Sequence, residues 1–465
     1  MGIKGVAMTS IAQILLDAGR QVSGCDVAGE FVTKKILDRL KLQIDKGFVH
    51  SLPEDIDGVI YTSAHGGPKN PMVTQAKERG VATFSQAEAL AYFFNQKKGV
   101  AVCGVGGKST VSAMITWILD QLNLQPSFSV GVGEIIGMNR TGRWNPKSEL
   151  MVAEADEYVI DPACCNNPEK MKPRFSFLQP YTTVCTNLEF DHPDVYNSIE
   201  HTQQVFLSFF GQIKNGGNLI FNADSPDLVE VVNSLPQVNK KSFGKSELAE
   251  AKLISSSVQS KKNIGVVEYG QQQFTLELII PGEFNLLNAL AACLAVESLG
   301  VEFAQAIKSI ASFQGTQRRF EFVGQKNGVD YYDDYAHHPQ EIRETIKALK
   351  AWCPGQRQVV AFQPHTFSRT REFFNEFVDA LSTADEVVML KIFPSAREAF
   401  DDKISSKMIA EQIQTRFPDK KVYSFESIDE LAEFAKTQLD RGDVMLTVGA
   451  GDIYEVYGII NRNLK

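Results

Sequence analysis

The sequence has no long hydrophobic run and few cysteines, and both shortages exclude classes of protein. Its uninterrupted apolar stretches fall well short of the roughly 18–20 residues that a membrane-spanning helix needs. The seven cysteines are scattered and odd in number, and none of their spacings is typical of a metal site. The N-terminus lacks a basic segment followed by an apolar one, so we expect no secretory signal. These absences predict a reduced, cytoplasmic protein.

Positive charge is also in short supply. Lysine and arginine together number 47 against 56 aspartates and glutamates, for a net charge of −9 with no long basic block. This balance argues against nucleic acid as a main partner. With 465 residues, of which 43% are hydrophobic, the chain is too long for one core. We therefore expect about three domains, no nucleic-acid or membrane partner, and a monomer or a homodimer.

The clearest motif is a glycine-rich turn between a predicted strand and a predicted helix. An apolar run ends at Cys103, and a helical pattern runs from Val111 to Leu122. Glycines let backbone N–H groups approach a phosphate, and a helix N-terminus favours negative charge. Lys108 would reach the terminal phosphates and the Ser109 hydroxyl could bind Mg²⁺; the alternative is a plain turn with a solvated lysine. The motif predicts a nucleoside triphosphate site formed by Gly104, Gly106, Gly107, Lys108, Ser109 and Thr110.

Two further segments of this middle block carry candidate ligands. Glu154 ends an apolar strand, where a carboxylate could hold Mg²⁺ directly or through water. Asp156 and Glu157 follow it, and we expect them to be solvated loop charges. His192 comes just after the next strand, at the edge of a parallel sheet where ligands bind in α/β proteins. The alternative for His192 is a loop histidine that bonds a nearby carbonyl.

The last third of the chain alternates strands and helices. Strands are predicted at 329–333, 359–363, 386–392, 421–425 and 444–448, which indicates a mostly parallel sheet. Arg319 lies at the expected domain junction, where an arginine could stabilise a transferring phosphoryl group. His365 and Arg369 follow a strand and could hold a carboxylate or a phosphate.

Residues 1–97 resemble a nucleotide-binding βαβ unit. A glycine turn from Gly2 to Ala7 opens a helix, and the next strand ends at Asp26. The first strand is either very short or begins in residues that precede this sequence, and we favour the second explanation. The fold class is therefore α/β with three domains: a Rossmann-like domain at 1–97, a P-loop domain with a mostly parallel sheet at 98–314, and a second Rossmann-like domain at 315–465.

Taken together, these motifs resemble the Mur ligase family, ATP-dependent amide-forming enzymes of peptidoglycan assembly. The resemblance covers essentially the whole chain, in order. The segments that carry it are Gly104–Thr110, Glu154–Glu157, Thr186–His192, Asp333–Pro339 and Phe362–Thr370.

The resemblance implies a function and roles for individual residues. ATP and Mg²⁺ would activate the carboxylate of UDP-N-acetylmuramate as an acyl phosphate, and L-alanine or, alternatively, a murein tripeptide would attack it. The implied catalytic residues are Lys108, Glu154, His192, Arg319 and His337, and the implied metal ligands are Ser109, Glu154 and His192. Nucleotide contacts would add Asn285, Asn288, Arg319 and Asp334. Substrate contacts would be Gly2, Gly5, Ala7, Asp26, Asn187, Tyr335, His337, His365 and Arg369, with the UDP end in the first domain and the amino acid in the third.

The chain departs from the family pattern at several places. Val105 and Gly106 replace Thr and His in the phosphate loop, Phe284 replaces His, and Thr366 replaces the Arg usual in alanine-adding members. The run from Asp161 to Lys172 has no clear counterpart. A further alternative is a P-loop NTPase or kinase that forms no amide.

Overall fold

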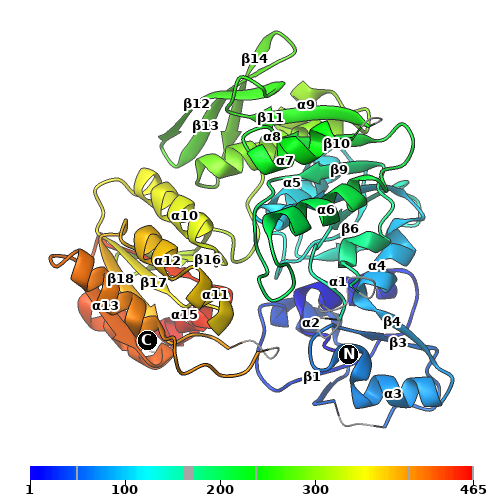
Figure 1. Ribbon diagram of the computed structural model, residues 1–465, viewed down its shortest axis with the longest axis horizontal. Helices are drawn as coiled ribbons and strands as arrows, with labels where there is room; N and C mark the ends of the chain where they lie inside the picture. The colour runs from blue at the N-terminus through cyan, green and yellow to red at the C-terminus, as the bar shows by residue number, and fades with distance from the viewer. Residues whose placement is uncertain (49–50, 162–170, 236–237, 395–397, 463–465) are drawn as a thin grey trace. The chain divides into compact units, whose positions relative to one another are not determined.

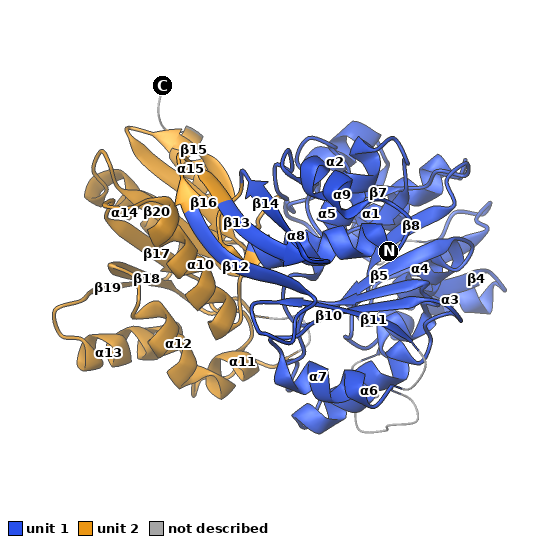
Figure 2. Cartoon of the chain, turned by 90° about the horizontal axis from the view of Figure 1, so that it is seen from above, with its two compact units in different colours: residues 1–257, 264–279, 285–316 blue, residues 258–263, 280–284, 317–465 orange. Residues whose placement is uncertain are grey.

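The computed structural model describes residues 1–48, 51–161, 171–235, 238–394 and 398–462. The chain divides into two compact units, which Figure 2 shows in different colours; Figure 1 labels the elements along the chain. The first unit contains residues 1–257, 264–279 and 285–316, and the second contains 258–263, 280–284 and 317–465. No helix within these ranges combines the length and the apolar character needed to cross a bilayer. Most of the run from Asp161 to Lys172 lies outside the described residues.

The first unit contains both helices and strands. Three of its elements include a few residues that belong to the second unit, at 258–259, 262–263 and 283–284. Its helices are α1 (Val6–Asp17), α2 (Lys34–Leu40), α3 (Pro71–Glu78), α4 (Gln86–Phe94), α5 (Lys108–Gln121), α6 (Ile199–Phe210), α7 (Pro226–Asn233), α8 (Glu283–Glu297) and α9 (Phe303–Ile310), with short 3-10 turns η1 (Gly67–Lys69) and η3 (Arg174–Phe177). Its strands are β1 (Gly24–Asp26), β2 (Ile44–Lys46), β3 (Gly58–Tyr61), β4 (Ala82–Ser85), β5 (Lys98–Cys103), β6 (Ser127–Ser129), β7 (Gly142–Arg143), β8 (Leu150–Glu154), β9 (Thr182–Cys185), β10 (Asn218–Asn222), β11 (Asn239–Gly244), β12 (Ala251–Gln259), β13 (Lys262–Tyr269) and β14 (Gln272–Leu278).

A ten-stranded sheet forms the body of this unit, in the order β14-β13-β12-β11-β10-β9-β5-β8-β6-β7. Strand β5 lies between β8 and β9 and is parallel to both. Its residues 99–103 are buried, as expected for a parallel strand covered on both faces. Consequently the ends of β5, β8 and β9, where the sequence places its phosphate loop, Glu154 and His192, lie together at one edge of the sheet.

The first 97 residues carry two small parallel sheets, β1-β2 and β3-β4. The backbone of the first residues lies between them: the Met1 amine donates to the Ile60 carbonyl at 2.9 Å and Gly2 N donates to the Cys25 carbonyl at 2.8 Å. Helices α1 and α4 bury Ile14 and Phe94 in the same core as residues of the large sheet. This shared core explains why the segment belongs to the first compact unit.

The second unit is built on a six-stranded sheet in the order β15-β16-β20-β17-β18-β19. Its strands are β15 (Glu321–Lys326), β16 (Val329–Asp334), β17 (Gln358–Phe362), β18 (Glu386–Leu390), β19 (Lys421–Phe425) and β20 (Val444–Val448). Its helices are α10 (Pro339–Trp352), α11 (Phe367–Glu372), α12 (Phe374–Leu381), α13 (Ser406–Arg416), α14 (Ile428–Gln438) and α15 (Val456–Arg462), with a 3-10 turn η4 (Ile453–Glu455).

All five strands predicted for this block are confirmed within two residues at each end. They pair in parallel, whereas the additional strand β15 pairs antiparallel with β16. Strand β15 has a register shift between Phe322 and Gly324 and is only partly buried. A bulged edge strand has no regular apolar alternation, and the sequence therefore gives little indication of it.

The buried Arg318 side chain links the segment that precedes β15 to two other parts of the second unit. Its guanidinium donates to Asp333 Oδ2 at 2.8 Å and to the carbonyls of Gly449 and Gly451 at 2.6 and 3.0 Å. The side chain is 6% exposed and lies 4.2 Å from the Tyr454 ring centroid. The arginine thus ties the start of β15 to the end of β16 and to the turn after β20.

We expect Arg318→Met to destabilise the protein by about 3–5 kcal/mol, because it leaves the buried Asp333 carboxylate without its charged partner and two carbonyls without this donor. The free energy of unfolding, measured by urea titration, tests this. Arg319→Met is the matched control, since Arg319 is less buried and its ring contact with Tyr335 is worth about 0.5–1 kcal/mol. Equal losses in the two variants would contradict the structural role assigned to Arg318.

Candidate active site

The glycine-rich turn between β5 and α5 adopts a backbone that only glycine adopts easily. Gly104 and Gly107 have φ angles of +122° and +82°. A Cβ on Gly104 would lie 2.2 Å from the Thr186 hydroxyl oxygen, and one on Gly107 would lie 2.8 Å from Asn288 Oδ1. Both glycines are therefore required by conformation and by space. The turn delivers Lys108 as the first residue of α5, three residues before Val111, where the sequence pattern predicts the helix to begin.

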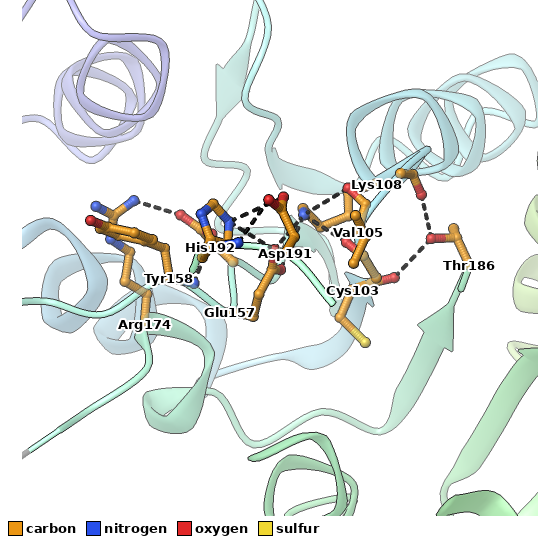
Figure 3. A network of polar contacts seen from close by, with 12 residues as sticks. Cys103, Val105, Lys108, Glu157, Tyr158, Arg174, Thr186, Asp191 and His192 are labelled. Carbon is orange, nitrogen blue, oxygen red and sulfur yellow. Dashed lines mark hydrogen bonds and ion pairs between the residues drawn. The ribbon is translucent and has the colours of Figure 1, made fainter. Parts of the chain in front are cut away.

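Thr186 and Asn187, which come just after β9, contact the glycine-rich turn through their side chains. Asn187 Oδ1 accepts a hydrogen bond from Gly106 N at 2.9 Å. The Thr186 hydroxyl lies within hydrogen-bond distance of the carbonyls of Gly106 and Cys103 (Figure 3). Asn187 was predicted to contact substrate, but the structure shows it bracing the phosphate loop. A direct contact with substrate stays a prediction.

The ammonium group of Lys108 is paired inside the unit. It donates to Gly104 O at 2.6 Å and lies 3.0 Å from both carboxylate oxygens of Glu157 (Figure 3). Burial alone would lower the pKa of Lys108, but the carboxylates of Glu157, Asp156 and Glu154 outweigh it and raise the pKa. The expectation that Glu157 is a solvated loop charge is wrong, because its side chain is only 3% exposed.

Glu154 and Asp156, the two other acids of the segment 154–157, have different partners. Glu154 Oε2 accepts from Gly131 N at 2.9 Å. Asp156 forms an ion pair with Arg174 at 2.5 Å, and its side chain stays 33% exposed, so it is a paired charge that water still reaches. Burial would raise the pKa of Asp156, but the charges of Arg174 and Lys108 lower it to about 2. Glu154 is thus the acid of the run whose carboxylate turns toward the loop after β6.

His192 lies on the other side of Glu157 from Lys108. Its Nε2 is 3.4 Å from Glu157 Oε1, and its ring packs edge-on against Tyr158 with centroids 4.9 Å apart (Figure 3). The backbone of His192 has a φ of +57°, which is uncommon for a residue with a side chain. Such conformations cluster at functional sites, where the surrounding structure holds them.

The donor chemistry of this edge fits a divalent cation in part. A buried Ser109 hydroxyl and the Glu154 carboxylate are oxygen ligands of the kind that Mg²⁺ prefers. Among the described residues, no three histidine, cysteine, aspartate or glutamate side chains are grouped as a metal site. A cation here would therefore depend on oxygens from elsewhere, such as water and phosphate.

Helix α8 brings two predicted nucleotide contacts to the phosphate loop. Asn285 is buried, and its Oδ1 accepts from Asn288 Nδ2 at 3.1 Å. The close approach of Asn288 Oδ1 to the Cα of Gly107 places this pair beside the loop. The structure therefore brings α8 and the loop together, although they are almost 180 residues apart in sequence.

The predicted diphosphate loop near the N-terminus is held by Asp26. Asp26 is buried, and its carboxylate accepts from Lys4 N at 2.7 Å and from Val27 N at 2.8 Å. Gly2 has a φ of +76° and lies so close to Thr62 that a Cβ would be 2.5 Å from its methyl group. Gly5 precedes the first residue of α1, and Ala7 is the second residue of that helix.

The second unit presents its own group of predicted residues. Asp334 Oδ2 accepts from Phe320 N at 2.7 Å and its Oδ1 accepts from Ala336 N at 2.6 Å. Burial raises the pKa of Asp334 to about 7, despite the opposing charge of Arg319. Arg318 is paired with Asp333, and Phe320 N donates to Asp334. Arg319, between them, lies at the turn with its guanidinium 4.9 Å from the Tyr335 ring centroid.

Three further predicted residues lie at the ends of β16 and β17. His337 Nδ1 is 3.1 Å from the Tyr335 carbonyl, and Glu341 Oε2 accepts from His337 N at 3.2 Å. His365 stacks on Phe393 with ring centroids 6.0 Å apart. Arg369 is 6% exposed on α11.

Thr366, which departs from the family pattern, caps helix α11. It has a φ of +72°, and its hydroxyl accepts from Arg369 N at 3.3 Å. Glu398 accepts from Phe367 N at 2.6 Å and from the Ser368 hydroxyl at 3.0 Å. The start of α11 is therefore held by the chain's own side chains.

The predicted site residues thus fall into two groups, one in each unit. The sequence analysis missed Glu157 as a partner of Lys108, Thr186 as a support of the loop, and Glu341 and Glu398 as partners of predicted residues. The spacing Glu154-x-x-Glu157 was visible, but strand alternation does not apply after β8 ends at Glu154. Glu341 forms a capping box with His338 across Pro339, a spacing that was visible in the sequence. Glu398 is 31 residues from Phe367, and local sequence offers no comparable signal for it.

Comparison with known protein families matches three consecutive segments of the chain. Residues 1–98 match "Mur ligase family, catalytic domain", residues 102–296 match "Mur ligase middle domain", and residues 318–451 match "Mur ligase, glutamate ligase domain". Three domain models in this order confirm the predicted α/β fold class with three domains.

Individual relatives agree. The UDP-N-acetylmuramate–L-alanine ligase of Clostridium kluyveri is 35% identical over 464 residues, covering 98% of this chain and 96% of the relative. The crystal structure of the UDP-N-acetylmuramate-alanine ligase of Thermotoga maritima superposes with a TM-score of 0.82 at 26% identity, covering 99% of this chain and 97% of that one. A murein peptide ligase from Psychrobacter arcticus shares the fold, with a TM-score of 0.71 at 20% identity over 100% of this chain and 98% of that one. On these matches, the chain belongs to the Mur ligase family.

Proposed function

We propose that this chain is an ATP-dependent ligase that joins L-alanine to the carboxylate of UDP-N-acetylmuramate in peptidoglycan synthesis. The observation that carries the proposal is the 35% identity to an enzyme of that name along nearly the whole of both chains. The phosphate loop with Lys108, whose side chain is 13% exposed, would supply the nucleotide site that such a reaction needs. The nucleotide-linked substrate is a cytoplasmic precursor, so the proposal places the protein in the cytoplasm.

The proposal divides the work among three segments. Residues 1–97 would bind the UDP end of the substrate, with the loop from Gly2 to Ala7 and Asp26 at the diphosphate. Residues 98–314 would bind ATP through the phosphate loop, with Asn285 and Asn288 near the adenine base of the nucleotide. Residues 315–465 would bind the amino acid, with Asp334 at the ribose of the nucleotide.

The chemistry explains why ATP is consumed. A carboxylate is a poor acyl donor, because its leaving group would be an oxide. Attack of the carboxylate oxygen on the γ-phosphorus breaks the bond to ADP and forms an acyl phosphate. The amine nitrogen of L-alanine then attacks the carbonyl carbon, inorganic phosphate leaves, and the nitrogen loses a proton to give the amide. Positioning and neutralisation of charge supply most of the rate enhancement in such reactions.

The chain's own residues have separate tasks in this scheme. Lys108 would bind the β- and γ-phosphates, and Arg319 would stabilise charge on the transferring phosphoryl group. His337, His365 and Arg369 would lie near the amino acid and the acyl phosphate, with Tyr335 beside them. Mg²⁺ would be held by Ser109, Glu154 and His192, and when bound it neutralises phosphate oxygens.

We expect phosphate release from ATP in the presence of UDP-N-acetylmuramate to depend on L-alanine. The measurement is a phosphate-release assay in which L-alanine is compared with the tripeptide L-Ala-γ-D-Glu-diamino acid. The tripeptide is the second candidate because Tyr158 and the Asn187–His192 run resemble tripeptide-adding relatives. Release with the tripeptide alone would reverse the proposal, and hydrolysis of ATP without either amine would indicate a P-loop NTPase.

We expect Lys108→Ala to lower kcat/KM for ATP by about 10²–10³-fold, the usual cost of removing one preorganised charge from a transition state. Circular dichroism and thermal melting check that the variant folds. Lys147→Ala is the control, because Lys147 is an exposed lysine of the same unit. Unchanged turnover in a folded Lys108→Ala variant would contradict the assignment of the phosphate loop.

A further inference from the structure

The hydrogen-bonding capacity of Lys108 is filled by the chain itself. An ammonium group has three donors. Here its nitrogen lies 2.6 Å from Gly104 O, 3.4 Å from Val105 O, and 3.0 Å from each oxygen of Glu157. A phosphate oxygen that binds Lys108 must therefore share or displace one of these acceptors.

We propose that Glu157 is a positioning residue that holds Lys108 when no nucleotide is bound and releases it to the phosphates, so that nucleotide competes with a buried carboxylate for one ammonium group. This inference rests on the ATP site of the proposed function. It assigns to Glu157 a role that the motif alone does not indicate.

Of the acceptors around Lys108, Glu157 is the one that a phosphate can replace, because Gly104 and Val105 lie in the phosphate loop and Glu157 does not. Gly104 and Val105 belong to the phosphate loop, only a few residues from Lys108, and they stay beside it wherever the loop moves. Glu157 comes from the segment after β8, a separate part of the sheet edge. A carboxylate and a phosphate offer the same kind of charged oxygen to a lysine, and charge-assisted hydrogen bonds are formed equally well with either.

The backbone of Glu157 is held by a hydrogen bond, and its carboxylate contacts two different side chains. The buried Tyr196 hydroxyl donates to the Glu157 carbonyl. The carboxylate meets Lys108 on one side and His192 Nε2, at 3.4 Å, on the other. When Lys108 turns to a phosphate, the Oε1 of Glu157 still has the Nε2 of His192 as a neighbour at 3.4 Å.

The test is nucleotide affinity in Glu157→Gln. The amide keeps the size of the side chain but competes weakly for an ammonium group. We therefore expect ADP and a fluorescent ATP analogue to bind about 5- to 50-fold more tightly, which lies within the roughly 2- to 160-fold that coupling energies between contacting residues represent. Binding is measured by fluorescence titration of the full chain without added amine. Glu157→Asp, which keeps the charge, is expected to bind closer to wild type.

A double-mutant cycle shows whether the effect passes through Lys108. In a Lys108→Ala background, Glu157→Gln should no longer change the affinity. Glu247→Gln removes one charge from an exposed ion pair with Lys252 in the same unit and should leave the affinity unchanged. Thermal melting confirms that each variant is folded.

Unchanged or weaker nucleotide binding in folded Glu157→Gln would overturn the proposal, as would tightening that persists without Lys108. The binding experiment needs neither UDP-N-acetylmuramate nor an amine. If ligation fails while the cycle behaves as expected, the ligase assignment is wrong and the role of Glu157 in a nucleotide site stands.

Discussion

A largely enclosed ammonium group, 13% exposed, must be given acceptors, and much of the first unit is arranged around that requirement. Lys108 sits at the start of α5 with a loop carbonyl and the Glu157 carboxylate around it. Glu157 in turn contacts His192 and is anchored by Tyr196. Because the three parallel strands β5, β8 and β9 end at one edge, segments distant in sequence meet at this single charge.

In the second unit, two adjacent buried acids, Asp333 and Asp334, hold separate segments of the chain. Asp333 pairs with the Arg318 guanidinium, and Asp334 accepts backbone hydrogen bonds from both sides of the end of β16. Neighbouring residues on a strand point to opposite faces, so the two carboxylates serve different segments. The result fixes the residues on either side of Arg319 and leaves its guanidinium at the turn. Arg318 is thus a structural arginine, and Arg319 lies beside the Tyr335 ring.

The sequence predicts the strands of the second unit and the phosphate loop well, because buried parallel strands are continuous apolar runs and the loop has a glycine signature. Strand β15 was missed because its bulge breaks the alternation. Glu157 was misread because its partner Lys108 lies 49 residues away. Only folding brings such pairs together, and the same holds for the pairing of Asp334 with the Phe320 backbone. Local patterns reveal elements and motifs, whereas partners across the sheet edge depend on topology.

The packing of α1 and α4 into the core of the large sheet has a consequence for how this chain can vary. Ile14 and Phe94 are buried beside residues of β5 and β8, and the Ser10 hydroxyl donates to Ser129 Oγ at 2.6 Å. Separated from the sheet, the first 97 residues would expose this apolar face to water. Recombination between relatives at this boundary would thus exchange two halves of one core, and only pairs of segments whose side chains fit together would fold.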